Sequence, residues 1–401
     1  MFNVAILGFG TVGSGVYKVI NDNANVLKKF AGDDINVKYV LDLREFPGNP
    51  VEKVLVHDID IILNDDEVNC VVEVMGGIEP ANTFVRRAIT RGKSVCTSNK
   101  ELVAKYGAEI LALAKENNVS FLFEASVGGG IPVIRAINES LTADNFDSIA
   151  GILNGTTNYI LTKMSKEGLS FDEVLKTAQE KGYAERNPEA DVEGYDACRK
   201  IAILTSLITG KQVDFEDIST EGISHITKED IYYSNKSGLP LKLLGLMKKK
   251  EGKVYAMVAP FMLGDEHTLK DVDGVYNAVN LHGDLLGNVM FYGKGAGSLP
   301  TASAVVSDVV EIAKNGNKNI AITWDTEKIS LGDMASFNSK YFVRLKVTGK
   351  DDELKKAFGD VQFIEPLEGE TAFVTANEYS HEKLAELLSA YTVLTTIRIA
   401  E

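Results

Sequence analysis

The segment from Gly182 to Lys200 concentrates polar side chains that could carry out chemistry. It starts as an irregular loop with Glu185 and Asp191 and then enters a helix that contains Asp196 and Lys200. Residues four apart lie on one face of a helix, so the Asp196 carboxylate and the Lys200 ammonium can form an ion pair. An exposed pair of this kind is common and contributes only about 0.3–0.5 kcal/mol.

The helix continues beyond Lys200 with residues that favour burial. Positions 201–208 read Ile-Ala-Ile-Leu-Thr-Ser-Leu-Ile, which is apolar on nearly every side. A lysine that enters such a helix beside Asp196 is expected to be partly desolvated, and that setting suits proton transfer. From these residues alone, an ordinary ion pair and a catalytic Lys200 both stay open.

Two further polar clusters follow strand-like runs. The segment 97–100 (Thr-Ser-Asn-Lys) ends the run 94–97, at the sheet edge where open α/β proteins bind ligands. A cation is unfavourable at a helix start, so a merely solvated Lys100 is the weaker interpretation. The segment 124–132 holds three consecutive glycines. They fit a close backbone approach, a domain hinge or a tight turn, and the sequence does not separate these.

The N-terminal apolar run, Phe2–Leu7, leads into the motif 8–13 (Gly-Phe-Gly-Thr-Val-Gly) and then into a helical pattern. A G-x-G-x-x-G motif between a strand and a helix is typical of dinucleotide-binding sites. Gly8 permits the tight turn, Gly10 lets the backbone approach a pyrophosphate, and Gly13 lets helix and strand pack closely. The N–H groups at the helix start would then face the phosphates.

The end of the second predicted strand carries two opposed signals for cofactor choice. Asp42 could accept a hydrogen bond from a ribose 2′-hydroxyl and favour NAD, whereas Arg44 could pair with a 2′-phosphate and favour NADP. The cofactor preference therefore stays open at this stage.

Short apolar runs alternate with helical segments in the first third of the chain. Further runs lie at 37–41, 68–74, 94–97 and 120–123, with helical patterns at 80–91 and 101–117. This alternation predicts a parallel sheet covered by helices on both faces. After Pro132 it gives way to separate helices and strand-like runs, which predict a mostly antiparallel sheet.

We therefore expect an α/β protein with three parts. Residues 1–131, joined by about 300–316, form a Rossmann-type dinucleotide-binding domain, and 132–299 form an α+β substrate and dimerisation domain. Residues 338–401 have the order βαββαβ of a small ferredoxin-like unit. The polar stretch 315–339 is expected to be a linker.

Composition and charge exclude several classes of protein. The 401 residues are 45% hydrophobic and 25% charged, with 42 Lys plus Arg against 57 Asp plus Glu, and the net charge of −15 argues against nucleic acid or an anionic membrane as partner. Three scattered cysteines and five separated histidines do not predict a disulfide framework or a metal cluster. With no cationic leader and no long apolar stretch, we expect a cytoplasmic protein.

Six motifs in order, ending before about Lys314, resemble the homoserine dehydrogenase family. They are 8–13, 97–100, 128–132, 151–159 (Gly-Ile-Leu-Asn-Gly-Thr-Thr-Asn-Tyr), 182–200 and 297–304. The resemblance implies interconversion of L-homoserine and L-aspartate 4-semialdehyde with NADP or NAD, on the route to threonine and methionine. It also implies a small-molecule substrate and a homodimer or homotetramer.

By position, the resemblance implies that Lys200 is the general acid/base and that Asp196 orients it. Lys100 would lie between cofactor and substrate, and Glu185 would bind the substrate ammonium. The implied substrate pocket contains Tyr183, Glu185, Asp191 and Lys200. The implied cofactor residues are Gly8, Phe9, Gly10, Thr11, Val12, Gly13, Met75, Gly76, Thr97, Ser98, Lys100 and Gly297. Backbone carbonyls of Glu124, Val127, Gly129 and Ile131 would bind a monovalent cation, sodium.

The C-terminal unit has the strand order of an ACT regulatory domain, and 341–347 resembles its opening strand. The Asp-x-Pro-Gly-like turn expected next is absent, since 348–352 reads Thr-Gly-Lys-Asp-Asp. We therefore expect a degenerate ACT-like module that serves assembly or weak regulation, without full inhibition by threonine.

Two other functions compete with a hydroxyl dehydrogenase. An aldehyde dehydrogenase needs a cysteine nucleophile, for which Cys96 and Cys198 are candidates. A nucleotide sensor needs only the motif 8–13, and it would leave Asp196 and Lys200 without a purpose.

Overall fold

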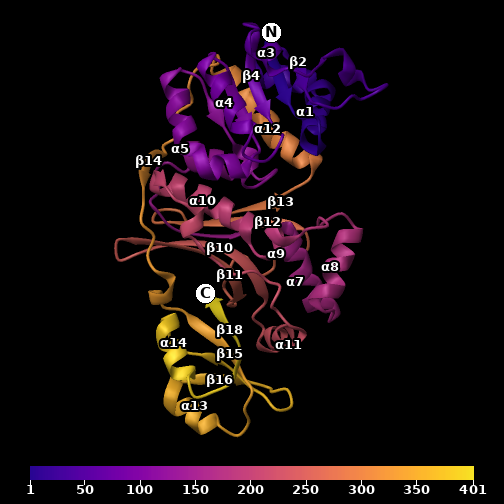
Figure 1. The fold of residues 1–401 in the computed structure, drawn as a ribbon. Helices are drawn as coiled ribbons and strands as arrows, with labels where there is room; N and C mark the ends of the chain where they lie inside the picture. Colours follow the sequence, from indigo (N-terminus) through magenta and orange to yellow (C-terminus); the bar gives the residue numbers. More distant parts are fainter. The chain divides into compact units, whose positions relative to one another are not determined.

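The computed structural model describes residues 1–401, and these fall into two compact units (Figure 1). The first contains 1–144, 202–215 and 291–329, and the second contains 145–201, 216–290 and 330–401. The three domain boundaries expected from the sequence stay a prediction. None of the helices combines the length and the apolar character that a membrane span needs.

The first unit is built on a six-stranded parallel sheet with the order β3-β2-β1-β4-β5-β6. The strands are β1 (Phe2–Leu7), β2 (Ile35–Leu41), β3 (Leu55–Val56), β4 (Val68–Glu73), β5 (Ser94–Thr97) and β6 (Phe121–Leu122). The helices are α1 (Thr11–Asp22), α2 (Ala24–Ala31), α3 (Ile59–Leu63), α4 (Ala81–Thr90), α5 (Lys100–Glu116), α6 (Val133–Arg135) and α12 (Ser298–Lys314). This confirms the predicted Rossmann-type arrangement.

Burial along β1 shows why these runs are nearly continuous in apolar residues. Val4 and Ile6 belong to the core cluster that contains residues of α1 and α12. The alternate side chains, Ala5 and Leu7, point to the opposite face and are just as completely buried. Helices therefore cover both faces of the sheet.

The predicted linker 315–339 is wrong for its first half, because residues 315–329 belong to the first unit. Trp324 is buried, and its Nε1 donates a hydrogen bond to Gln212 Oε1 at 3.0 Å. Its ring lies so close to Gly107 that a Cβ there would be 2.9 Å away. Strand β14 (Asp325–Lys328) also pairs with β8 (Lys211–Gln212). The sequence analysis missed these contacts because the neighbouring residues in the segment are polar.

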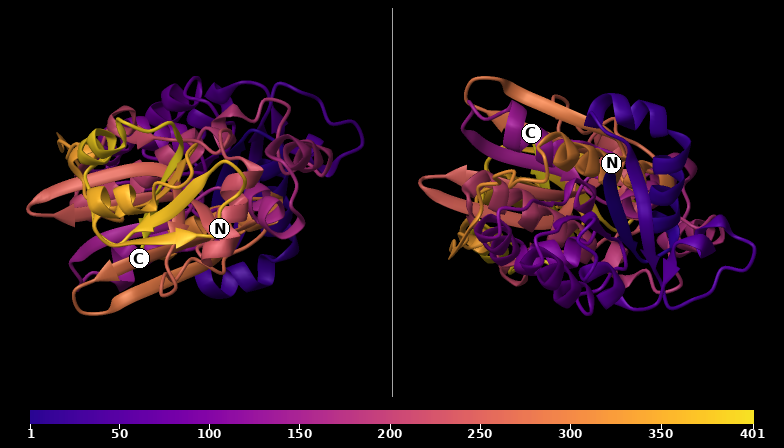
Figure 2. Two further views of the ribbon diagram at one scale, coloured as in Figure 1. Left: turned by 90° about the horizontal axis from the view of Figure 1, so that it is seen from below. Right: turned by 90° about the horizontal axis from the view of Figure 1, so that it is seen from above.

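A ten-stranded sheet belongs to the second unit, except for residues 291–294 of its edge strand β13, which are in the first. The strand order of the sheet is β13-β12-β7-β10-β11-β18-β15-β17-β16, and β9 pairs additionally with β11. Its strands are β7 (Phe146–Ile152), β9 (Ser219–Thr220), β10 (Leu241–Lys250), β11 (Lys253–Leu263), β12 (Tyr276–Gly283), β13 (Gly287–Lys294), β15 (Lys340–Leu345), β16 (Val361–Ile364), β17 (Thr371–Thr375) and β18 (Val393–Ala400). Most pairs are antiparallel, as predicted, and the parallel ones join β11 to β9 and β18. Two hairpins, β10–β11 and β12–β13, project from this sheet in Figure 2.

Helices of the second unit include α7 (Gly155–Glu167), α8 (Phe171–Glu180), α9 (Glu189–Val192) and α11 (Lys228–Ser237). Helix α10 (Tyr195–Thr209) begins in the second unit, and its residues from 202 onward belong to the first. Helix α7 packs on β10 and β12. Helix α11 was not predicted, although a capping box marks its start: Thr227 Oγ1 accepts from Asp230 N, and the Asp230 carboxylate accepts from Thr227 N.

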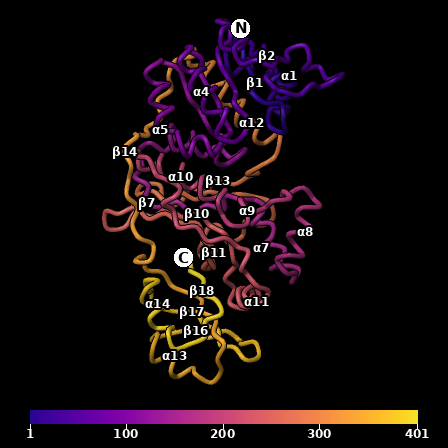
Figure 3. Tube along the Cα trace, viewed as in Figure 1, coloured from indigo at the N-terminus to yellow at the C-terminus, as the bar shows by residue number.

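The C-terminal elements run β15, α13 (Asp351–Phe358), β16, β17, α14 (His381–Leu388) and β18, which confirms the predicted order βαββαβ. Its strands pair antiparallel in the order β18-β15-β17-β16. The terminal strand β18 continues the sheet beside β11 (Figure 3), with Phe261 opposite Arg398. An ACT-like function for this part stays a prediction.

Candidate active site

Lys200 and Asp196 form a buried ion pair one turn apart on α10. Lys200 Nζ donates to Asp196 Oδ2 and to the Leu153 carbonyl oxygen, each at 2.7 Å. Only 8% of Lys200 and 3% of Asp196 is exposed. The ordinary surface pair is therefore excluded, since charges are buried in this way at functional sites or in specific networks.

Asn154 connects this pair to a second carboxylate. Its Nδ2 donates to Asp191 Oδ1 at 2.7 Å and to Asp196 Oδ2 at 2.9 Å. Its Oδ1 accepts from Thr157 N at 2.9 Å and caps α7. One amide thus brings together carboxylates from α9 and α10. The sequence analysis missed this role, because an asparagine before a helix indicates only a cap.

Of the six residues predicted as catalytic or substrate-binding, three are brought together: Asp191, Asp196 and Lys200. Tyr183 and Glu185 lie on an exposed loop. The Tyr183 ring packs edge-on against Tyr159, and its carbonyl accepts from Thr156 Oγ1 at 2.6 Å. The roles of Tyr183 and Glu185 stay predictions.

The turn between β1 and α1 has the shape that a dinucleotide requires. Gly8 has a positive φ of 96°, and a Cβ on Gly13 would lie 1.9 Å from the Gly8 carbonyl oxygen. Gly10 directly precedes α1 as its N-cap residue and offers no side-chain cap, and nothing lies within 4 Å of where its Cβ would be. The N–H groups of the first turn are thus open to an anion. The residues fit a bound pyrophosphate.

A buried carboxylate, Glu73, organises the neighbouring loops. It accepts from Met75 N at 2.8 Å and from Thr97 Oγ1 at 2.6 Å, while Asn99 Nδ2 donates to the Gly77 carbonyl at 2.5 Å. Burial raises the pKa of Glu73. The structure thus connects Met75 and Gly76 to the segment with Thr97 and Ser98, all of them predicted cofactor residues, through a side chain that sequence analysis did not single out.

Two other predicted residues lie at helix starts in the same unit. Lys100 is the first residue of α5, whose cap is Asn99, with Oδ1 accepting from Leu102 N. Gly297 precedes α12 with a φ of 117°. The next residue, Ser298, donates through Oγ to the Thr11 carbonyl at 2.7 Å, which fixes α12 to the glycine-rich turn.

The triple glycine at 128–130 serves a close backbone approach. A Cβ on Gly129 would lie 2.3 Å from the Gly295 carbonyl oxygen, and Gly130 N donates to the Lys294 carbonyl at 3.2 Å. Ile131 N also donates to the Gly128 carbonyl at 3.0 Å across Gly129, whose φ is 56°, so the glycines serve both the close backbone approach and the tight turn among the interpretations that the sequence left open. Side chains of larger residues would collide with this neighbouring backbone.

The predicted cation loop has no acidic cluster. The Glu124 carboxylate accepts from Ile134 N at 2.9 Å and from Arg135 N at 2.7 Å, so both of its oxygens already bind main-chain N–H groups. No group of three or more His, Cys, Asp or Glu side chains is placed to hold a metal ion. Sodium held by the carbonyls of Glu124, Val127, Gly129 and Ile131 stays a prediction.

Neither candidate cysteine nucleophile has the surroundings of a reactive thiol. Cys96 is fully buried and Cys198 is 4% exposed. Burial raises the pKa of both thiols, which suppresses the nucleophilic thiolate. This disfavours the aldehyde dehydrogenase alternative.

Comparisons with known proteins identify the family of this chain. A family model described as homoserine dehydrogenase matches residues 132–310, and one described as homoserine dehydrogenase, NAD binding domain, matches 8–124. The homoserine dehydrogenase of Bacillus subtilis is 46% identical over 315 residues, which are 78% of this chain and 73% of that protein. That of Synechocystis is 45% identical over 316 residues, covering 77% and 72%.

Solved structures give the same result over the whole length. The crystal structure of a homoserine dehydrogenase from Thiobacillus denitrificans matches with a TM-score of 0.90 and 34% identity, covering 100% of this chain and 98% of that one. A Staphylococcus aureus homoserine dehydrogenase at pH 7.5 matches with a TM-score of 0.83 and 36% identity, again covering 100% and 98%. The chain belongs to the homoserine dehydrogenase family.

Proposed function

We propose that the chain interconverts L-homoserine and L-aspartate 4-semialdehyde by reversible NAD(P)-dependent hydride transfer, in threonine and methionine biosynthesis. The observation that carries the proposal is the buried Asp196–Lys200 pair, which Asn154 connects to Asp191. A proton must move on the substrate oxygen whenever hydride moves on the carbon, and this cluster offers a positioned group for it.

Lys200 Nζ holds and moves that proton. In reduction of the aldehyde, the ammonium donates a proton to the carbonyl oxygen, and in oxidation of the alcohol the amine takes the hydroxyl proton back. A bound nicotinamide supplies the hydride donor or acceptor. Asp196 and the Leu153 carbonyl fix the position of Nζ, and the Asp196 carboxylate balances the ammonium charge.

The amino-acid end of the substrate is bound by acidic residues. Glu185 binds the substrate ammonium, and Asp191 and Tyr183 belong to the same pocket. Carboxylates suit this task because hydrogen bonds between opposite charges are strong. Lys100 contacts cofactor and substrate during turnover.

The experiment that tests this function is homoserine-dependent reduction of NAD and NADP at alkaline pH, in the wild type and in Lys200→Ala. We expect turnover to collapse in the variant while calorimetry still detects dinucleotide binding. Turnover that survives would move the acid/base role to another residue, with Lys100 next. Dinucleotide binding without turnover in the wild type would favour the sensor.

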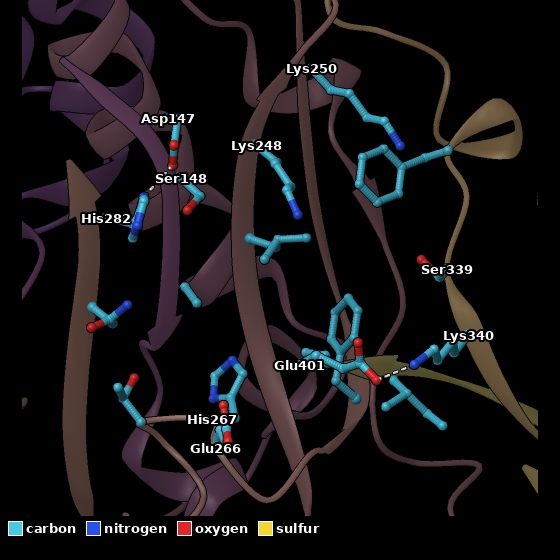
Figure 4. A pocket seen from close by; sticks show the side chains of 18 of the residues that line it. Asp147, Ser148, Lys248, Lys250, Glu266, His267, His282, Ser339, Lys340 and Glu401 are labelled. Carbon is cyan, nitrogen blue, oxygen red and sulfur yellow. Dashed lines mark hydrogen bonds and ion pairs between the residues drawn. The ribbon is translucent and has the colours of Figure 1, made fainter. Parts of the chain in front are cut away.

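We also propose a homodimer or homotetramer that uses the antiparallel sheet. A cavity of about 470 Å³ opens on this sheet, where His282 pairs with Asp147 and Lys340 with Glu401 (Figure 4). None of the predicted site residues lines it. The edge strand β13 carries exposed apolar side chains, including Met290 and Tyr292. Light scattering that gives a monomer mass would contradict this.

The remaining proposals concern the environment of the enzyme. We propose a cytoplasmic location, a sodium ion at the loop 124–131, and a C-terminal unit that gives at most weak regulation. Replacing sodium by choline should lower activity if the cation is bound. Full inhibition by millimolar threonine, lost on deletion of residues beyond about 335, would contradict the proposal for the C-terminal unit.

A further inference from the structure

Asp42, directly after β2, is fixed by hydrogen bonds that include two from the main chain. Phe9 N donates to Oδ2 at 2.8 Å and Arg44 N donates to Oδ1 at 3.0 Å. The Arg44 guanidinium adds a bidentate contact, Nε to Oδ1 at 2.9 Å and Nη2 to Oδ2 at 2.8 Å. Because the Phe9 contact comes from the glycine-rich turn, the carboxylate stays at the dinucleotide site even if the Arg44 side chain moves.

The two partners differ in how firmly they are held. The Asp42 side chain is 9% exposed, whereas that of Arg44 is 62% exposed. The Arg44 guanidinium holds the pKa of Asp42 well below its usual range. Asp42 is thus a permanent negative charge at a fixed place, and Arg44 is an exposed arm that neutralises it.

The cavity around this pair suits an adenosine. Its volume is about 690 Å³, and apolar side chains including Leu43, Ile59 and Phe84 line it beside Gly8 and Gly10. Leu43 is 89% exposed, so its side chain is available to contact a ligand in this cavity. A flat, apolar base fits such a lining.

The nitrogen-bearing side chains of the cavity, Arg44 and His57, already have oxygen partners. Arg44 pairs with Asp42 and also lies over the Phe46 ring, 5.2 Å from its centre. His57 donates through Nδ1 to the Asp42 carbonyl at 2.7 Å, and its Nε2 lies 3.0 Å from Glu45 Oε1. A ligand phosphate at this place would have to compete with the Asp42 carboxylate for Arg44 and with the oxygen partners of His57.

We propose that Asp42 makes this enzyme select NAD over NADP, an inference that rests on the proposed function. A ribose 2′-hydroxyl can donate to the Asp42 carboxylate in place of one contact from the exposed Arg44 side chain. A 2′-phosphate has no proton to donate in its dianionic form and brings about two negative charges. If Arg44 turned to that phosphate, the fixed Asp42 carboxylate would be left beside it without its counter-charge.

The experiment measures both dinucleotides in two ways. Values of kcat/KM are determined at saturating homoserine, and dissociation constants are measured by calorimetry without homoserine. We expect NAD to be preferred by about tenfold or more in both. Asp42→Asn should reduce the preference by about tenfold, because it removes the charge and frees Arg44. Arg44→Ala should retain or widen it.

Asp65→Asn is the matched control, because Asp65 also pairs with a cation, Lys38, in the same unit. It should leave the ratio unchanged. Tighter binding of NADP by the wild type, or an unchanged ratio in Asp42→Asn, would overturn the proposal. The NAD preferences of the wild type and of Arg44→Ala also test the proposal, so it stays testable if Asp42→Asn does not fold. Lost turnover with the NAD binding preference intact would overturn the proposed function alone.

Discussion

Lys200 Nζ lies 2.7 Å from Asp196 Oδ2 on one face of α10, and both side chains are buried. An exposed pair with the same spacing occurs on α7, between Lys163 and Glu167. The same i, i+4 spacing therefore gives an exposed surface ion pair on α7 and a buried ion pair at the proposed active site on α10. Burial makes the difference, since a charge removed from water depends on its partner much more than an exposed one does.

Asp196→Asn tests whether the buried pair matters more for activity and stability than the exposed pair does. The substitution keeps the shape of the side chain but leaves the buried Lys200 ammonium without its counter-charge. We expect kcat to fall about 100-fold and the free energy of unfolding to fall by about 3 kcal/mol. The control Glu167→Gln should change the free energy by less than about 0.5 kcal/mol and leave kcat unchanged. Steady-state kinetics and urea unfolding measure both, and a wild-type kcat in Asp196→Asn would contradict the assignment.

Asn154 should affect activity separately from helix capping. Asn154→Ser keeps an oxygen that can cap α7 but loses the amide that binds Asp191 and Asp196. We expect kcat/KM for homoserine to fall about 10- to 100-fold, with little loss of stability. Asn154→Ala should lose the same activity and also about 1 kcal/mol from the missing cap. If Asn154→Ser retained full activity, Asn154 would act only as the cap of α7.

Local patterns predicted much of the fold, because the physics behind them is local. Apolar runs between helical segments predicted the parallel sheet, and the spacing 8–13 predicted the first turn. Contacts between distant segments were not visible. Trp324 and Gln212 are 112 residues apart, so polar neighbours made the segment around Trp324 resemble a linker.

The site was predictable to the extent that its residues were neighbours in sequence. Asp196 and Lys200 lie one turn apart, so helical spacing found them. Asn154 lies 42 residues from Asp196, and Glu73 contacts Thr97 across 24 residues. Only the folded chain reveals those contacts, because an isolated asparagine or glutamate at the end of a strand gives no signal of its own.

Arg344 should be essential for the stability of the second unit. It is 8% exposed in its side chain and pairs with Asp230 on α11 at 3.1 Å and Glu370 at 2.7 Å. Arg344→Met leaves the fully buried Asp230 without this partner, so we expect a loss of about 3–5 kcal/mol in the free energy of unfolding. The exposed Lys346→Met is the control. Urea unfolding that gave equal values for both variants would contradict this.

Asp308 should make stability fall as the pH rises. Burial, and then the negative charge of Glu124, raise the pKa of Asp308 to about 7, although Arg135 Nη2 donates to it at 2.7 Å. A carboxyl whose pKa is higher in the folded than in the unfolded chain stabilises the protein fully below its ordinary pKa of about 4. That contribution is lost between about pH 4 and 7, at up to about 1.4 kcal/mol per pH unit.

Asp308→Asn tests this because the amide is neutral at every pH and can still accept from Glu124 N. Urea unfolding at pH 5 and pH 8 should show the wild type losing about 2–3 kcal/mol relative to the variant, which follows from the two pH units below the folded-state pKa. Asp22→Asn removes an exposed partner of Lys18 and should give a profile parallel to the wild type. A parallel profile for Asp308→Asn as well would mean that Arg135 keeps the Asp308 carboxylate ionised throughout, and that burial does not decide its charge.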